Sequence, residues 1–132
     1  MIAAVAALAA GIAEPAAVRR DPVAAASEAI SGTLVPIMLA DAIARHCRAA
    51  DPAGTAGRDA ALARWRAANR VDPFEAALAA VAAQAPELAG GQDRMRTAAG
   101  AQAARTVAED PAACTRLPAT LARPQYRIRR IT

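Results

Sequence analysis

The fold is decided by the stretch TLVPIMLADAIARHCRA, residues 33–49, the most hydrophobic run after the N-terminus. Its first half is apolar on nearly every side, which is typical of a helix surrounded by other elements rather than one lying at the surface. Arg45 and Arg48 fall in its last turn, where cations interact favourably with the helix dipole. We therefore predict a central helix that begins at Thr33 as N-cap and carries Pro36 in its first turn.

Composition predicts that the elements around this helix are helices too. The chain of 132 residues contains 43 Ala, 16 Arg, no Lys and three aromatic residues, and its formal net charge is +4. Alanine is the best helix former, whereas strands favour β-branched and aromatic residues. A chain of this length fits one domain. We predict an all-α fold, a small alanine-rich bundle of four to five helices over residues 18–122.

Four Asp-Pro dipeptides divide the sequence into candidate helices. Aspartate is a favoured N-cap, and proline is favoured at the first helical position. Each pair therefore predicts a helix start, with the aspartate as a cap rather than a catalytic acid. Further breaks are expected at residues 31–33 and 90–91. The pairs are Asp21-Pro22, Asp51-Pro52, Asp72-Pro73 and Asp110-Pro111.

Apolar residues at helical spacing predict the inward faces of these helices. Trp65 follows Leu62 at such a spacing, and we interpret it as a core residue with Arg58, Arg64 and Arg66 turned outward. The other expected core positions are Ala61, Ala68, Phe74, Leu78, Val81, Met95, Ala99, Ala103 and Val107.

The N-terminal residues Met1–Ala13 carry no charge. As a helix they would rise about 20 Å, too little to cross a hydrocarbon core of about 30 Å, so we expect no transmembrane span. A short apolar run followed by small residues is typical of a secretory signal peptide, here residues 1–17. The alternatives are an apolar helix packed on the body and a peripheral membrane anchor.

The two cysteines also favour export from the cytoplasm. Cys47 and Cys114 are far apart in the sequence, and no CxxC or zinc spacing occurs. An even count in a small, aromatic-poor chain predicts one disulfide. The alternatives are two buried thiols, or a reactive Cys47 whose pKa is lowered by neighbouring cations.

The last ten residues, 123–132, carry the surplus positive charge. They hold four arginines and no acid, whereas residues 1–122 balance twelve arginines against twelve acids. Tyr126 and Ile128 alternate with arginines, which predicts an extended basic tail. It could add a strand to a partner's sheet, lie on an anionic surface, or be a docked or disordered terminus. The candidate partner-binding residues are Tyr126, Arg127, Arg129 and Arg130.

No motif for catalysis or cofactor binding is present. His46 is the single histidine and has arginine nearby on both sides, which disfavours a metal ligand or general base. We expect no catalytic residues, no metal and no cofactor. The sequence favours an exported periplasmic or secreted binding or accessory protein, with another protein as its partner, as in a subunit of an envelope complex. The alternatives are a cytoplasmic nucleic-acid-associated or phage-type structural protein that uses the tail, and a helical envelope enzyme with arginine-based anion recognition.

Overall fold

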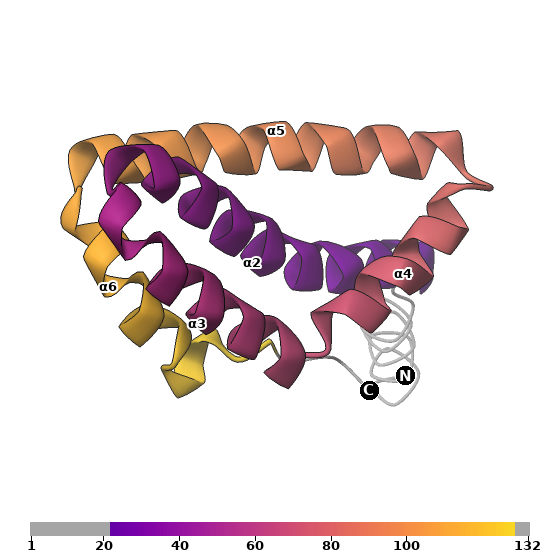
Figure 1. Ribbon diagram of the computed structural model, residues 1–132. Helices are drawn as coiled ribbons and strands as arrows, with labels where there is room; N and C mark the ends of the chain where they lie inside the picture. The colour runs from indigo at the N-terminus through magenta and orange to yellow at the C-terminus, as the bar shows by residue number, and fades with distance from the viewer. Residues whose placement is uncertain (1–21, 129–132) are drawn as a thin grey trace, which may run out of the picture. The chain divides into compact units, whose positions relative to one another are not determined.

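The computed structural model describes residues 22–128, which form five α-helices and two short 3-10 helices (Figure 1). The α-helices are α2 (Pro22–Ala50), α3 (Thr55–Ala68), α4 (Val71–Ala82), α5 (Pro86–Glu109) and α6 (Ala112–Leu121); the 3-10 helices are η1 (Pro52–Gly54) and η2 (Pro124–Tyr126). No strand occurs among these residues, and the predicted all-α class is confirmed. The predicted signal peptide, residues 1–17, lies outside the described part.

The chain divides into two compact units, residues 1–32 and 33–132. The described part of the first unit is the beginning of α2, residues 22–32. The second unit holds the rest of α2 and all the other helices, and everything below concerns it.

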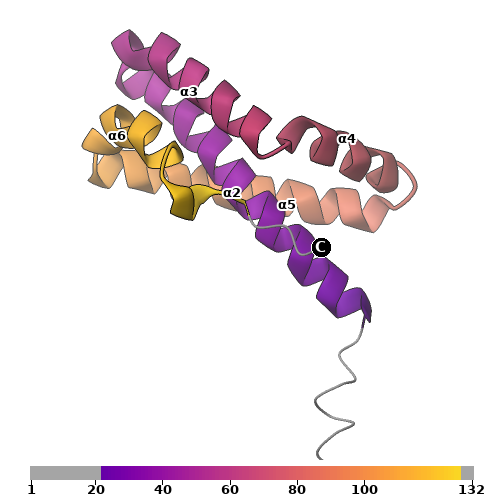
Figure 2. The ribbon, with the colours of Figure 1, turned by 90° about the horizontal axis from the view of Figure 1, so that it is seen from below.

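In the second unit, α2 crosses between the pair α3–α4 and the pair α5–α6 (Figures 1 and 2). Helix α3 packs against α4 and α6, and α5 packs against the same two helices. Residues from four helices meet in the core: Ile37, Ala40, Ala44, Trp65, Val71, Leu117 and Leu121. Residues 33–50 are therefore the central helix that the hydrophobic run predicts. By length and composition, residues Ala25–Ala50 could also cross a membrane, although the same helix supplies Ile37, Ala40 and Ala44 to the core.

Both helix breaks predicted from glycine are wrong. Helix α2 runs from Pro22 to Ala50 through residues 31–33 and through Pro36, and α5 continues through Gly90 and Gly91. One glycine costs a helix only about 1 kcal/mol, which tertiary packing can outweigh. Since α2 continues through Thr33, this residue is not an N-cap, and Pro36 lies inside α2 rather than in its first turn. Proline's φ is compatible with a helix, but an interior proline removes one hydrogen bond and crowds the carbonyl four residues earlier, a cost that the tertiary packing of α2 must outweigh.

The inward faces agree with the predicted stripes, with three exceptions. Trp65, Ala61, Leu78, Ala99, Ala103 and Val107 are buried as expected. Val81 is 57% exposed, and Ala68 is exposed as well. The third exception is a pair of arginines predicted to face solvent: Arg58 is buried, and only 23% of the Arg66 side chain is exposed.

Helix starts do lie at the four Asp-Pro pairs, at Pro22, Pro52, Val71 and Ala112, but none of the described aspartates makes the predicted side-chain capping hydrogen bond. Asp51 precedes η1 without a capping hydrogen bond, Asp72 lies inside the first turn of α4, and Asp110 ends α5. Each carboxylate forms an ion pair with an arginine instead. The partners are Arg58, Arg66 and Arg116 respectively. Asp21 lies outside the described residues.

Arg58 fastens the start of α3 to the end of α2. Its side chain donates to Asp51 Oδ2 at 2.8 Å, to the Cys47 carbonyl at 3.1 Å and to the Asp51 carbonyl. Only 2% of the residue is exposed. A Cβ at Gly54 would lie 2.5 Å from Arg58 Nη1, which explains why glycine occupies that position. A buried charge is tolerated here because backbone carbonyls and a carboxylate surround it.

Cys47 and Cys114 form the predicted disulfide. Their Cα atoms are 5.5 Å apart, and both residues are buried beside Val107 and Ile43. The bond joins the last turn of α2 to α6, so α3, α4 and α5 lie within the loop that it closes. Because both sulfurs are in the bond, the alternatives of buried thiols and of a reactive Cys47 are wrong.

Candidate functional site

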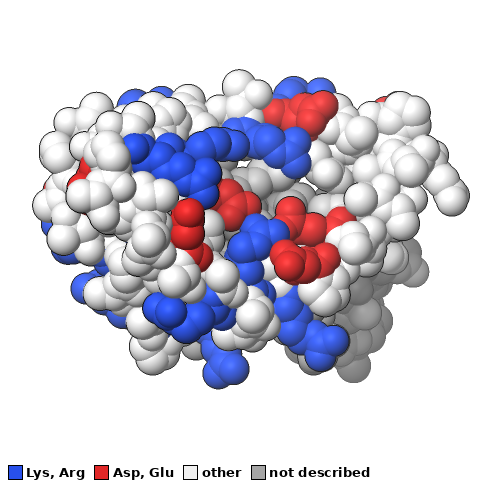
Figure 3. All heavy atoms as spheres, viewed as in Figure 1, with Lys and Arg blue, Asp and Glu red and all other residues white. Residues whose placement is uncertain are grey.

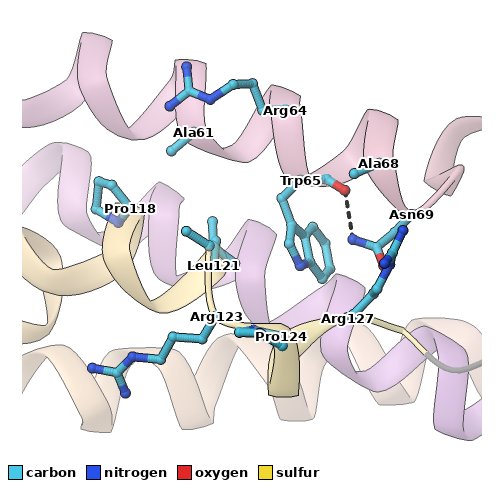
Figure 4. A pocket seen from close by; sticks show the side chains of 11 residues that line it. Ala61, Arg64, Trp65, Ala68, Asn69, Pro118, Leu121, Arg123, Pro124 and Arg127 are labelled. Atoms are coloured by element: carbon cyan, nitrogen blue, oxygen red, sulfur yellow. Dashed lines mark hydrogen bonds between the residues drawn. The ribbon is translucent and has the colours of Figure 1, made fainter.

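A groove of about 380 Å³ lies between α3 and the C-terminal end of the second unit (Figure 4). One wall comes from α3 and the residue after it, and the other from α6 and the tail. We call it the arginine groove. The lining residues are Ala61, Arg64, Trp65, Ala68, Asn69, Pro118, Leu121, Ala122, Arg123, Pro124 and Arg127.

The tail turns back along α3 because of Pro124. A residue before proline is disfavoured in the helical region, and Arg123 is extended with φ −73° and ψ 139°. Residues 124–126 then form η2, and Arg127 is extended again. The extended tail predicted from alternation is therefore right at Arg123 and Arg127 and wrong at residues 124–126, where proline begins a 3-10 turn.

Two hydrogen bonds, one to Trp65 of α3 and one to Asn69 directly after α3, hold residues 126–128 of the tail in place, and we call them the tail clip. Trp65 Nε1 donates to the Tyr126 carbonyl at 3.1 Å. The Ile128 backbone N–H donates to Asn69 Oδ1 at 2.8 Å. Asn69 is itself oriented by donating from Nδ2 to the Trp65 carbonyl at 2.8 Å (Figure 4). Trp65 is therefore a core residue, as predicted, and its indole N–H also binds the backbone of the tail.

The groove has an apolar floor and a positively charged rim. Pro118, Pro124 and the small accessible parts of the buried Trp65 and Leu121 supply carbon surface. Charge comes from Arg64, Arg123 and Arg127. No carboxylate lines the groove. Across the described residues, these three arginines form no ion pair. Five others do: Arg48, Arg58, Arg66, Arg96 and Arg116. The rim therefore concentrates uncompensated positive charge over an apolar surface.

The structure brings part of the predicted site into this groove. Arg127 lines it, whereas Tyr126 contributes its backbone carbonyl to the tail clip and leaves its side chain 43% exposed. Arg129 and Arg130 lie outside the described residues.

Sequence reasoning missed two important members of the site. Arg64 is exposed, as predicted. Its position beside the tail, more than fifty residues further along the chain, could not be predicted from any local sequence pattern. Asn69 was not singled out, because an asparagine just after a helix is an ordinary C-terminal residue. Its amide joins two segments 59 residues apart.

Comparison with protein families, curated proteins and solved structures finds no match to this chain. What the groove can do is therefore argued from its chemistry. Each guanidinium presents five N–H donors in a planar fork that fits a carboxylate or phosphate. The lining contains no hydroxyl, thiol, imidazole or carboxyl group that could act as nucleophile or general base. The described residues also hold no cluster of potential metal ligands. The geometry favours binding of an anion attached to an apolar body.

Proposed function

We propose that this protein is an exported binding protein that holds an acidic segment of another protein in the arginine groove. The observation that carries the proposal is the set of three unpaired arginines around an apolar floor. An acidic peptide with an apolar side chain complements both features at once. Its carboxylates would accept from Arg64, Arg123 and Arg127, while the apolar side chain covers the floor beside Trp65.

A peptide is favoured over a nucleic acid for two reasons. Residues 22–122 hold ten arginines and ten acidic residues, so their formal charges balance, whereas binding along a phosphate backbone depends on a surplus of basic charge. Single strands are also held by stacking bases on aromatic side chains. Trp65 is 6% exposed and Phe74 is partly buried, which leaves Tyr126 as the exposed aromatic side chain of the described part.

Export is supported by the disulfide and by the apolar N-terminal sequence. Disulfides persist in oxidising compartments such as the periplasm and the extracellular space. An uncharged run followed by small residues fits a secretory signal. The intact mass of the protein from its native host tests this part. Export predicts loss of residues near 1–17 together with absence of free thiols, and a chain that retains Met1 with two free thiols would contradict it.

Binding is tested by fluorescence anisotropy with a labelled peptide of alternating Glu and Leu residues. The full oxidised protein should bind it, and a Gln–Leu peptide of the same length should bind at least about tenfold more weakly, because charge-assisted hydrogen bonds are lost. Raising the salt concentration should weaken the Glu–Leu complex.

Variants distinguish the groove from general attraction to a basic protein. Arg64→Gln and Arg123→Gln should each weaken peptide binding several-fold. Arg105→Gln, on α5 and outside the groove, removes the same charge and should have little effect. An equal loss in all three variants would refute the groove as the site. Tighter binding of a single-stranded oligonucleotide than of the peptide would favour the nucleic-acid alternative instead.

A further inference from the structure

A second cavity, of about 410 Å³, lies between α2, α4 and α5 and shares no residue with the arginine groove. The view of this face in Figure 3 shows a hollow with basic side chains along one margin and acidic ones along the other. The lining residues are Leu34, Ile37, Met38, Asp41, Arg45, Glu75, Ala76, Leu78, Ala79, Gln92 and Arg96.

The acidic side of the cavity is built around Arg66, which reaches over from α3. Its guanidinium donates to both Asp41 oxygens at 3.0 and 2.8 Å, to Asp72 Oδ1 at 2.8 Å and to Glu75 Oε1. Burial by itself lowers the pKa of Arg66, but the hydrogen bond to Asp72, the charge of Asp41 and the hydrogen bond to Glu75 raise it above its ordinary value. Three carboxylates thus share the single positive charge of Arg66, so this cluster carries more negative than positive charge. Two of the three, Asp41 and Glu75, line the cavity.

The basic side consists of Arg45 from α2 and Arg96 from α5. Arg45 is exposed and forms no ion pair with a described carboxylate. Arg96 pairs with Asp93 at 3.1 Å, but both side chains are more than half exposed, so this pair holds Arg96 only weakly. Both guanidinium groups are therefore available to an anion in the cavity.

Gln92 adds a polar group that lacks a partner. Its Nε2 atom is buried and has no hydrogen-bond partner within the described chain, although the residue lines the cavity. A buried amide donor without an acceptor is unfavourable, and a bound carboxylate would satisfy it. The remaining lining is apolar, from Leu34, Ile37, Met38 and Leu78.

We propose that this cavity binds a small zwitterion with an apolar side chain, the chemistry of a free amino acid such as leucine. The ammonium group would donate to Asp41 and Glu75. The carboxylate would accept from Arg45, Arg96 and the Gln92 amide, and the side chain would lie against Leu34 and Leu78. A simple anion would leave the excess carboxylate charge unbalanced, and a simple cation would face two arginines. This inference is independent of peptide binding in the arginine groove.

Isothermal titration calorimetry of the full oxidised protein with L-leucine tests the proposal. Two matched compounds keep the branched carbon chain but lack one charge: isocaproate has no ammonium group, and isoamylamine has no carboxylate. Leucine should bind at least about tenfold more tightly than either, because each loses a charge-assisted interaction. Absence of binding by leucine and by the other apolar amino acids, up to their solubility limits, would overturn the proposal. Equal binding of isoamylamine would overturn the assigned role of the arginines.

Variants locate the site. Arg96→Gln should weaken leucine binding about tenfold, whereas Arg94→Gln removes the same charge from the same helix outside the cavity and should leave it unchanged. Glu75→Gln should also weaken binding. Because Glu75 also binds Arg66, its substitution could disturb the fold. Arg45→Gln changes an exposed residue that forms no ion pair within the described chain, so it should weaken leucine binding without unfolding the protein. Circular dichroism checks that both variants are folded. Arg64→Gln, in the arginine groove, should not affect leucine binding. Equal affinities of the Arg96 and Arg94 variants would refute the assignment.

Discussion

Breaking the Cys47–Cys114 disulfide is expected to remove about 4 kcal/mol from the free energy of unfolding. The two residues are separated by 67 positions in the sequence. In the chain-entropy model, closing a loop of that length lowers the entropy of the unfolded chain by about 15 cal/mol/K, which corresponds to about 4 kcal/mol at 25 °C. Domains of this size are typically stable by about 5–15 kcal/mol. Reduction should therefore leave the fold marginal.

The measurement is equilibrium urea unfolding, followed by far-ultraviolet circular dichroism, of the oxidised and reduced protein. Reduction should lower the urea midpoint and increase the m-value, because an unfolded chain without the crosslink exposes more surface. The double variant C47A/C114A should lose slightly more stability than the reduced protein, since it also removes two buried sulfur atoms. Reductant should not change its unfolding curve.

The reasoning assumes that the enclosed residues of α3, α4 and α5 are free in the unfolded state. A loss below about 1 kcal/mol with an unchanged m-value would refute that assumption. It would mean that the unfolded chain already holds the two cysteines near each other without the bond.

Three further substitutions test local features. Gly54→Ala should destabilise the protein by about 2 kcal/mol in urea unfolding, because the added methyl displaces the buried Arg58 guanidinium; wild-type stability would contradict the packing described. Gly91→Ala should stabilise it by about 0.5–1 kcal/mol, measured as a higher melting temperature, since a methyl there has space within a helix; a lower melting temperature would refute this. Asn69→Ala removes the acceptor of the Ile128 N–H, so trypsin should cleave the tail about tenfold faster by mass spectrometry. An unchanged cleavage rate would show that the tail clip does not hold the tail.

The features predicted best from sequence are those set by composition and by local period. Abundant alanine and scarce aromatic residues identify helices, and the run at residues 33–49 identifies the central one. Trp65 and the Ala99, Ala103 and Val107 stripe are buried because a 3.6-residue period determines which side faces the core.

The features that sequence reasoning missed depend on contacts between elements. The aspartates of the Asp-Pro pairs have the local pattern of N-caps, but in the structure three of them pair with arginines six or seven residues away. Arg58 falls on a face that periodicity assigns to solvent, yet the end of α2 covers it. Arg64 and Arg127 come together only after the tail docks. Such pairings require the three-dimensional arrangement, since nothing within one helix encodes them.

The tail clip makes the arginine groove conditional on the state of the C-terminus. Arg127 belongs to the groove only while Trp65 and Asn69 hold the neighbouring backbone. The apparent affinity for a ligand is then the intrinsic affinity multiplied by the fraction of molecules with the clip closed. By the same linkage, a bound ligand must shift the population toward the closed form. Changes that open the tail clip would therefore weaken binding even where they alter no atom that touches the ligand.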